Sequence, residues 1–298
     1  MLYLLLWTCV AFATQDDVRL PLDPPSRWLP EDPGITALPA LGGVGSMGVY
    51  PVGGPVHVWH GRGEFEAALI GFSRDTALTG GFSSETVADA RNSIDFRLVR
   101  LFYEATLGVR QRLGPGVAHV GFRHRCSHGV DDAVPDRILI RSGPTLGWRG
   151  LWDVSRWTLQ AGGDLEWTLI GQNPDTTFQP RGLLDGVGSA QVRLSDSLSW
   201  TTAAGLGGLL VGRDAEWWWG PSAPLGRTRV VALPTVATGP VVHGRGGDAR
   251  LLLHAQRLAD SGVGETAAPQ VLVAIRLELS PGQVSRSPGA DPPLETSR

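Results

Sequence analysis

Three segments of the chain alternate hydrophobic and polar residues with a two-residue period. In the segment 99–113 the polar face carries mainly arginine, glutamate and threonine, and the apolar face carries Val99, Leu101, Tyr103, Ala105, Leu107 and Val109. The segments 155–169 and 271–279 repeat this pattern. Because successive side chains of a strand point to opposite sides, the period predicts strands with one apolar and one polar face.

The alternation runs longer than is usual in soluble sheets, whose strands have about five or six residues. A tilted strand crosses a bilayer in roughly 9–11 residues, with apolar side chains toward lipid and polar side chains toward the interior. An open sheet edge in hydrocarbon would leave backbone groups unpaired at several kcal/mol each. The pattern therefore predicts an all-β fold, a single closed antiparallel transmembrane β-barrel.

Connection lengths agree with a barrel, since bacterial barrels alternate short periplasmic turns with longer external loops. "GPG" at 114–116, "RGLW" at 149–152 and "SDS" at 195–197 are predicted turns. Longer polar stretches lie near 73–92, 129–135, 171–185, 213–226 and 259–268. We predict about ten strands between 63 and 279, or twelve if 43–58 contributes a pair. Leu107, Trp157, Trp167 and Val273 should face outward, and Arg110, Arg156 and Glu166 inward.

The ends of the chain differ from its middle. An apolar run from Leu2 to Ala13, with the small residues Ala11 and Ala13, predicts a signal peptide over 1–13, with a buried strand as the alternative. The Pro-rich segment 14–55 is predicted as a periplasmic lead-in, 56–279 as the barrel and 280–298 as a disordered tail. Export and barrel together predict the bacterial outer membrane, with outer-membrane lipids, lipopolysaccharide included, and the outer-membrane assembly machinery as partners.

Charge excludes one class of partner. All 26 basic residues are arginine, against 29 acidic residues, and the net charge is −3. A nucleic-acid-binding surface needs clustered positive charge without matching acids, so no nucleic acid is expected. We expect no cofactor either.

The predicted inner face is rich in charged side chains. We expect the mixed charges to pair across a narrow lumen and fill it. A narrow anion-favouring pore is the alternative, because arginines outnumber acids among the predicted inner residues. These residues are Arg100, Glu104, Arg110, Arg112, Arg123, Arg125, Arg137, Arg141, Arg156, Asp164, Glu166, Arg193, Arg276 and Glu278.

The stretch "HVGFRHRCSHGVDD" at 119–132 carries the candidate chemistry. Alternation places His124 and Cys126 on the lipid-facing side, near the outer rim. If the stretch is catalytic, His124 is the general base, because imidazole titrates near neutrality. Cys126 is then the first candidate nucleophile and Ser127 the second. Asp131 or Asp132 would orient the histidine.

Two other interpretations of this stretch remain open. His124, His128, Asp131 and Asp132 could hold a ligand or a metal ion, although we assign no metal site. Alternatively, these side chains are simply the polar end of a strand.

"HRC" at 124–126 resembles the His-x-Ser pair of the outer-membrane phospholipase and lipid A deacylase barrels, which implies a surface lipid hydrolase. Cys126 stands where those families have serine, and Ser127 where they usually have asparagine. "HRCSHGVDD" with "PDRILIRSG" is similar to an uncharacterised bacterial barrel family whose strand end reads His-x-Ser-Ser-His. That resemblance covers about 25 residues and implies the class of protein without an activity.

The segment "EWWWGPSAP" falls in a predicted external loop. Trp217, Trp218 and Trp219 form either an aromatic girdle or a stacking platform for lipopolysaccharide or another glycan. The sequence as a whole predicts an outer-membrane barrel with a structural, transport or surface-binding role. A lipid hydrolase of the outer leaflet and a narrow anion-favouring pore are the alternatives.

Overall fold

The computed structural model describes most of the region predicted as barrel. The described residues are 29, 34–52, 58–89, 97–129, 139–172, 179–212, 229–244, 247–259 and 269–281. The predicted signal peptide and nearly all of the predicted tail lie outside them. No helix in this part of the chain is long and apolar enough to cross a bilayer.

The described residues form one antiparallel sheet. Its strands are β1 (Thr36–Val52), β2 (Trp59–Ser73), β3 (Thr76–Asp89), β4 (Arg97–Leu113), β5 (Gly116–Gly129), β6 (Leu139–Val154), β7 (Trp157–Trp167), β8 (Ile170–Gln172), β9 (Gln179–Arg193), β10 (Leu198–Gly212), β11 (Arg229–Gly244), β12 (Gly247–Ala259) and β13 (Pro269–Pro281).

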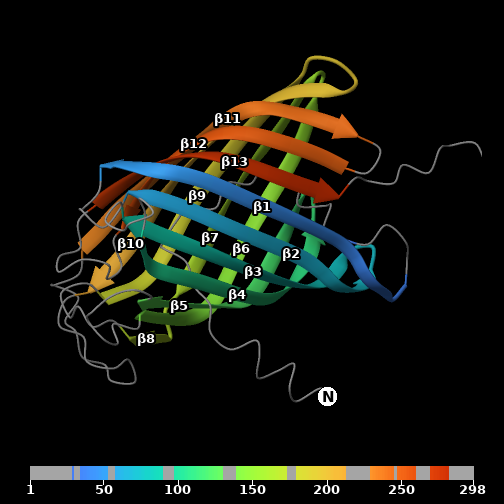
Figure 1. Ribbon diagram of the computed structural model, residues 1–298. Helices are drawn as coiled ribbons and strands as arrows, with labels where there is room; N and C mark the ends of the chain where they lie inside the picture. Colours follow the sequence, from blue (N-terminus) through green and yellow to red (C-terminus); the bar gives the residue numbers. More distant parts are fainter. Residues whose placement is uncertain are drawn as a thin grey trace, which may run out of the picture.

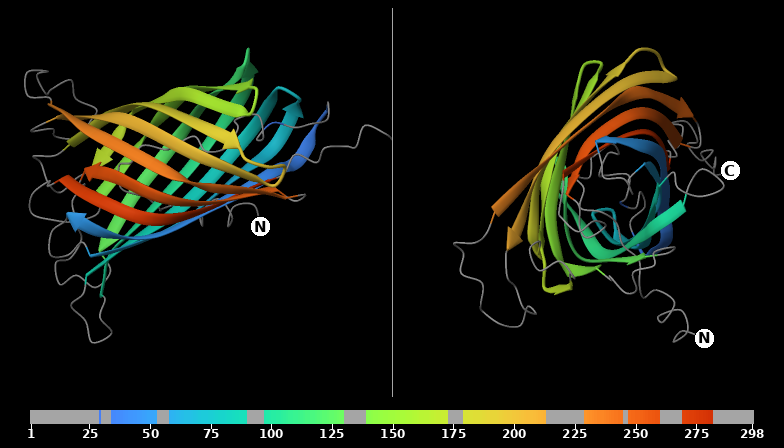
Figure 2. Two further views of the ribbon diagram at one scale, coloured as in Figure 1. Left: turned by 90° about the horizontal axis from the view of Figure 1, so that it is seen from above. Right: turned by 60° about the vertical axis from the view of Figure 1, so that its left-hand side comes forward.

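The sheet closes on itself, as Figure 1 and the right-hand view of Figure 2 show. Apart from β8, each strand pairs with the strands before and after it along the chain, β1 pairs with β13, and pairing of β5 with β6 completes the ring. β8 continues the line of β7, because β6 pairs first with β7 and then with β8. The fold is therefore a closed antiparallel barrel of 12 strands. The predicted fold class is confirmed, with the larger of the two predicted strand numbers.

Two strands lie where the ten-strand prediction had none, and the twelve-strand alternative expected a pair within 43–58, where the described residues form β1 alone. β1 falls within the predicted lead-in 14–55, yet it pairs with β2 and β13. β3 occupies most of the predicted external loop 73–92 and pairs with β2 and β4. Both predictions were wrong because glycine, serine and threonine are frequent in these strands and weaken the two-residue period. Their position is fixed by the strands on either side.

The turns at one end of the barrel are short. Gly114 and Pro115 join β4 to β5, and residues 194–197 join β9 to β10, which confirms the predicted "GPG" and "SDS" turns. The predicted "RGLW" turn at 149–152 is wrong, because β6 continues to Val154. Ser155 and Arg156 form that turn, with Ser155 at a φ of 57°. Arg156 is therefore exposed in a turn, and its predicted inward orientation is wrong.

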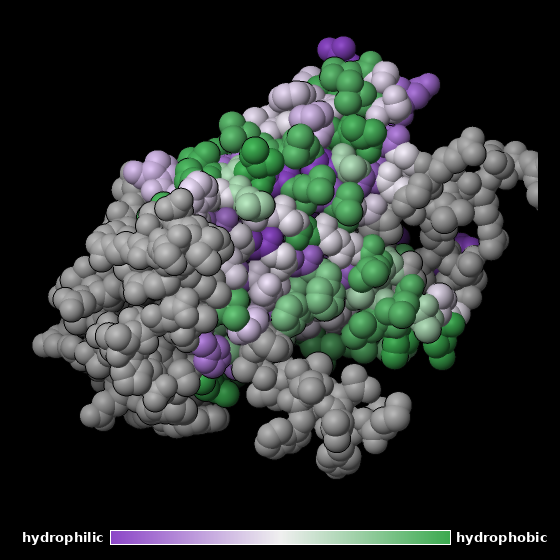
Figure 3. Space-filling view, viewed as in Figure 1, coloured by the Kyte–Doolittle hydropathy of each residue, from purple (hydrophilic) through white to green (hydrophobic). Residues whose placement is uncertain are grey.

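The outer face of the barrel is apolar. Leu107, Trp157 and Trp167 are 54%, 41% and 48% exposed, and Val273 shares the outward face of β13 with exposed Ile275. Figure 3 shows hydrophobic residues spread over the strands on one side of the barrel. Such a surface suits contact with lipid, and it confirms the predicted outward residues.

The connections separate the two ends of the barrel. The longer ones, such as 130–138 and 213–228, join strands at one end, and two- to four-residue connections join them at the other. By the usual orientation of bacterial barrels, the long connections are external. β5 therefore runs outward from Gly116, and Gly129 lies at its external end.

Candidate functional site

A cluster of buried charges lies on the inner wall formed by β4 to β7. Arg125 donates to Glu104 at 2.7 Å, and Arg141 donates to Glu166 at 2.7 Å. Arg123 joins the two carboxylates, with its Nη1 atom 2.5 Å from Glu166 and its Nε atom 3.5 Å from Glu104. Alternation directs these side chains inward, and Glu104, Arg125, Arg141 and Glu166 are at most 2% exposed. The predicted inward orientation of Glu166 is confirmed.

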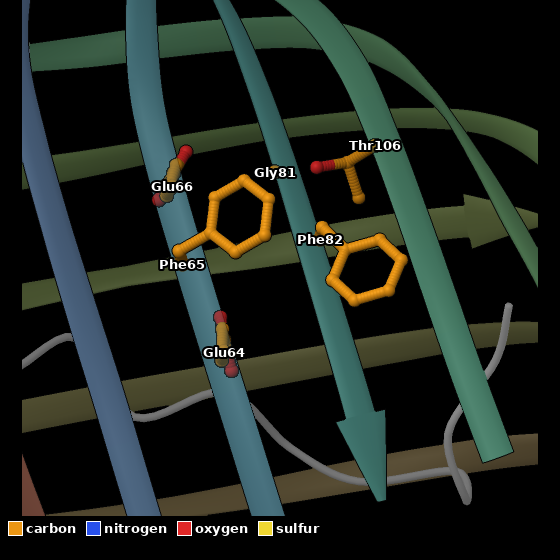
Figure 4. Close-up of a pocket in the computed structure, with 6 residues that line it drawn as sticks. All are labelled: Glu64, Phe65, Glu66, Gly81, Phe82 and Thr106. Carbon is orange, nitrogen blue, oxygen red and sulfur yellow. The ribbon is translucent and has the colours of Figure 1, made fainter. Parts of the chain in front are cut away.

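Further ion pairs continue along the same wall toward the short turns. Arg149 on β6 pairs with Asp164 on β7, and His119 on β5 lies 3.4 Å from the same carboxylate. Arg110 on β4 pairs with Glu66 on β2, which confirms the predicted inward orientation of Arg110. Figure 4 shows Glu66 beside a small hollow in the β2–β4 wall that Gly81 and Thr106 also line. The rings of Phe65 and Phe82 also border this hollow, and they stack with their centroids 5.4 Å apart.

A smaller charged group occupies the inner faces of β11 to β13. Arg276 donates to Glu278 at 2.6 Å, and Arg250 lies 3.9 Å from the same carboxylate. His243 binds Asp248 at 2.9 Å through Nδ1 and Ser199 at 2.7 Å through Nε2. Like the larger cluster, this group connects neighbouring strands.

The ion pairs given above, all between described side chains, follow the wall of the barrel, and none of them crosses the lumen, where the sequence predicted pairing. Every ion pair given above between described side chains joins residues of one strand or of strands at most two positions apart. A ring of 12 strands is wider than the predicted ten, which separates opposite walls. The inward charges of the described residues are also close to balance. They are Arg62, Arg110, Arg123, Arg125, Arg141, Arg149, Arg250 and Arg276, with Glu64, Glu66, Glu85, Glu104, Asp164, Glu166, Asp185, Asp248 and Glu278.

Several residues of the predicted inner list do not contribute to this wall. Arg112 lies beside the turn at Asp75 and is exposed, and Arg193 is exposed at the end of β9. Arg137 lies outside the described residues, and the structure describes the backbone of Arg100 but not its side chain. The predicted excess of arginine depended on such end positions.

The inner wall formed by β10 and β11 carries no charged arginine or carboxylate among its described side chains. Small residues occupy its middle, including Thr201, Ala203 and Ala237. Toward the external end it becomes apolar, where Leu209, Val211 and Leu233 pack with Leu183 and Val187 of β9. A second apolar cluster at the same end comprises Tyr50, Val87, Phe102, Leu258, Leu272 and Ala274.

The histidine- and cysteine-bearing stretch on β5 has the predicted alternation. Val120 and Phe122 are 59% and 43% exposed on the outer face, which His124 and Cys126 share. Cys126 is only 2% exposed, between Tyr103 of β4 and Ile140 of β6 in the pairing register. The polar partner of His124 is Ser142, directly opposite on β6, with Nδ1 and Oγ 2.6 Å apart.

The other predicted site residues do not join His124. Ser127 points into the barrel and is fully buried, on the face opposite to His124. His128 shares the outer face, where its ring lies 6.4 Å from that of Tyr103. Asp131, Asp132, Trp217, Trp218 and Trp219 lie outside the described residues. Nowhere in the described ranges do three His, Cys, Asp or Glu side chains converge as a metal site would require.

Sequence reasoning missed Ser142 and the partnership of His119 with Asp164. Both contacts join residues on different strands, so they depend on the pairing register. The composition of "RILIRSG" marks a strand but does not indicate which of its residues faces His124. The alternation on β5 did place His119 and His124 on opposite faces.

Comparison with known proteins supports the fold and leaves the family open. No protein-family model matches the chain, and no curated protein matches it. The COG4313 outer membrane channel from Pseudomonas putida F1 has a similar structure, with a TM-score of 0.53 at 10% identity over 87% of this chain and 99% of that chain. LpxR from Salmonella typhimurium gives a TM-score of 0.48 at 8% identity over 80% and 99% of the two chains. With its apolar outer face, the chain has the architecture of a bacterial outer-membrane β-barrel.

Proposed function

We propose that this protein is a narrow outer-membrane channel for small solutes. The observation that carries the proposal is the course of the ion pairs along the β2–β7 wall. In the ring order β11 lies across from β4, so small and uncharged side chains face the charged wall. Charges that pair within one wall form no ionic bridge to the opposite wall. The COG4313 protein, whose fold this chain shares, is described as an outer membrane channel.

The same wall argues against strong selection for anions. The carboxylates of the described inner face are about as numerous as the arginines, and seven of the nine lie in an ion pair with arginine. Glu85 pairs with His60 instead, and Asp185 accepts the backbone N–H of Asp164. We therefore expect a channel with weak charge selectivity. The second sequence-based alternative, an anion-favouring pore, would require a surplus of arginine.

Planar bilayer recordings of purified protein test the channel. We expect discrete conductance steps, which decrease in Gly205→Trp, because Gly205 lies on the inner face of β10 and a tryptophan there narrows the lumen. Ala204→Trp is the matched control, since Ala204 faces lipid and should leave the steps unchanged. A heat-dependent gel shift verifies that each variant folds. A folded wild-type barrel without conductance steps would contradict the proposal.

A second candidate function is hydrolysis of outer-leaflet lipids, and the contact between His124 and Ser142 favours it. Ser142 Oγ would attack an ester carbonyl while His124 takes the hydroxyl proton and passes it to the leaving alcohol. Water would then release the acyl group from Ser142. Ser142 is 2% exposed, so an ester would reach it only after neighbouring side chains move.

Release of fatty acid from phospholipid and lipid A by purified protein tests this candidate. His124→Ala and Ser142→Ala should each abolish release, whereas Cys126→Ala should retain it, because the contact in the structure joins the histidine to the serine. Equal release by all four proteins, or release by none, would leave His124 and Ser142 as a polar pair in the barrel wall.

A further inference from the structure

The ladder between β11 and β12 is incomplete, whereas the ladders on either side of it are continuous. β10 pairs with β11 from Leu198↔Val242 to Val211↔Arg229, and β12 pairs with β13 from Gly247↔Pro281 to Ala259↔Pro269. Between β11 and β12 the external-most pair is Thr235↔Gln256. Residues 232–234 and 257–259 belong to strands, yet they do not pair with each other. We call this stretch the outer seam.

Two prolines explain the incomplete ladder. Arg257 of β12 donates to the carbonyl of Ala232 at 3.2 Å, so this carbonyl points toward β12. In an antiparallel ladder the N–H and C=O of one residue point to the same neighbour, and every second residue points the same way. Pro234 and Pro240 therefore occupy positions that should donate to β12, and proline has no N–H to donate. Pairing is interrupted again at Gly239 and Pro240, as this argument requires.

The side chain of Arg257 bridges the outer seam. The alternation of β12 directs Arg257 outward, and its guanidinium reaches across to Ala232. This bond comes from a flexible side chain, at a place where the register would otherwise put the three residue pairs 234/257, 233/258 and 232/259. A side chain can swing aside without disturbing the rest of the ladder.

Both surfaces beside the outer seam are apolar. On the lumen side, Leu233 and Leu258 would face each other if the register of the paired part of this ladder continued. Both are at most 1% exposed, and they belong to the two apolar clusters of the external end. On the outer side, Val230 and Val236 are 68% and 45% exposed. An apolar lumen surface is unexpected in a barrel whose interior elsewhere carries ion pairs. At the outer seam only the unpaired part of the described β11–β12 ladder separates this apolar lumen surface from the lipid-facing side of the barrel.

We propose that the outer seam is a lateral opening through which molecules with an apolar body pass between the lumen and the outer leaflet. This inference rests on the proposed transport function and specifies its substrates. Such a molecule would contact Leu233 and Leu258 on the inside and acyl chains on the outside. It would therefore leave the barrel without crossing a polar surface. Arg257 is the positioning residue that holds the seam together when it is closed.

Cross-linking the seam in cells tests the proposal. Ala232→Cys and Ala259→Cys, in protein with Cys9 and Cys126 replaced by alanine, are joined with a short bifunctional thiol reagent. The probe is N-phenylnaphthylamine, whose entry through the outer membrane raises its fluorescence. We expect the cross-link to reduce entry to the rate of cells without the protein. Arg257→Ala should increase the rate severalfold.

The matched control joins Ala232→Cys to Gly208→Cys, which pairs with Ala232 across the continuous β10–β11 ladder. It should leave entry of the probe unchanged. Equal rates before and after the β11–β12 cross-link would overturn the lateral opening. Conductance of the same variants in planar bilayers distinguishes the two proposals. A barrel that conducts ions but admits no apolar probe would support the channel and contradict the lateral opening.

Discussion

At the scale of the residue, Glu166 is the most heavily engaged carboxylate of the charged wall. It contacts Arg123, Arg125 and Arg141, which come from two different strands, and it is 2% exposed. Removing charges from water costs several kcal/mol per ion, and close pairing must offset this cost. Loss of Glu166 would leave three neighbouring arginines to repel one another.

Replacement of Glu166 by glutamine should therefore destabilise the barrel by about 3–5 kcal/mol, the usual cost of breaking a buried ion pair from one side. The measurement is urea-induced unfolding in lipid vesicles. Asp75→Asn is the control, because its pair with Arg112 is exposed at a turn and should contribute at most about 1 kcal/mol. Similar losses in the free energy of unfolding of the two variants would show that the buried ion pairs contribute no more to stability than an exposed pair.

At the scale of the element, the strand formed by β7 and β8 is interrupted where it passes β6. Pro144 of β6 has no N–H, and β6 pairs with β7 only up to Thr145↔Glu166. The chain bulges at Thr168 and Leu169. Leu169 donates to the carbonyl of Ser142 at 2.8 Å, and Thr168 donates to that of Arg181 at 3.0 Å. The bulge thus keeps backbone groups paired on either side of a proline.

Gly143 makes this bulge possible, because a Cβ atom at this position would collide with the backbone carbonyl oxygen of Trp167. Gly143→Ala should cost about 1–3 kcal/mol through overpacking and lower the temperature of the gel shift. Gly45→Ala is the control, since a Cβ atom there meets nothing within 4 Å. An unchanged transition temperature in Gly143→Ala would mean that β7 and β8 can separate from β6 without cost.

At the scale of the whole molecule, closure gives every strand two neighbours and divides the interior into sectors. Among the described side chains, the charged wall extends from β2 to β7, and the wall without arginine or carboxylate covers β10 and β11. The smaller charged group of β12 and β13 includes His243 of β11. The apolar clusters at the external end adjoin the outer seam. The transport proposal and the lateral opening both depend on this arrangement, which no single strand contains.

The sequence by itself determined the class of fold and the faces of its clearest strands. Leu107 and Trp167 face outward, and Arg110 and Glu166 face inward, as the alternation predicts. The turn at Gly114 and Pro115 was also predicted correctly from the sequence. These features are local, because alternation follows from the pleat of a single strand and turn residues act on their own backbone. His124 and Cys126 were placed on the correct face for the same reason.

The tertiary structure alone decided which strands join the ring and which side chains meet. β1 and β3 lack a strong period, so pairing with neighbours on both sides defines them. Register brought Ser142 to His124 and left Ser127 on the opposite face. The course of the ion pairs and the incomplete β11–β12 ladder likewise depend on residues distant in the chain. Pairing between strands is non-local, and a shift of one residue would turn every side chain of a strand to the other face.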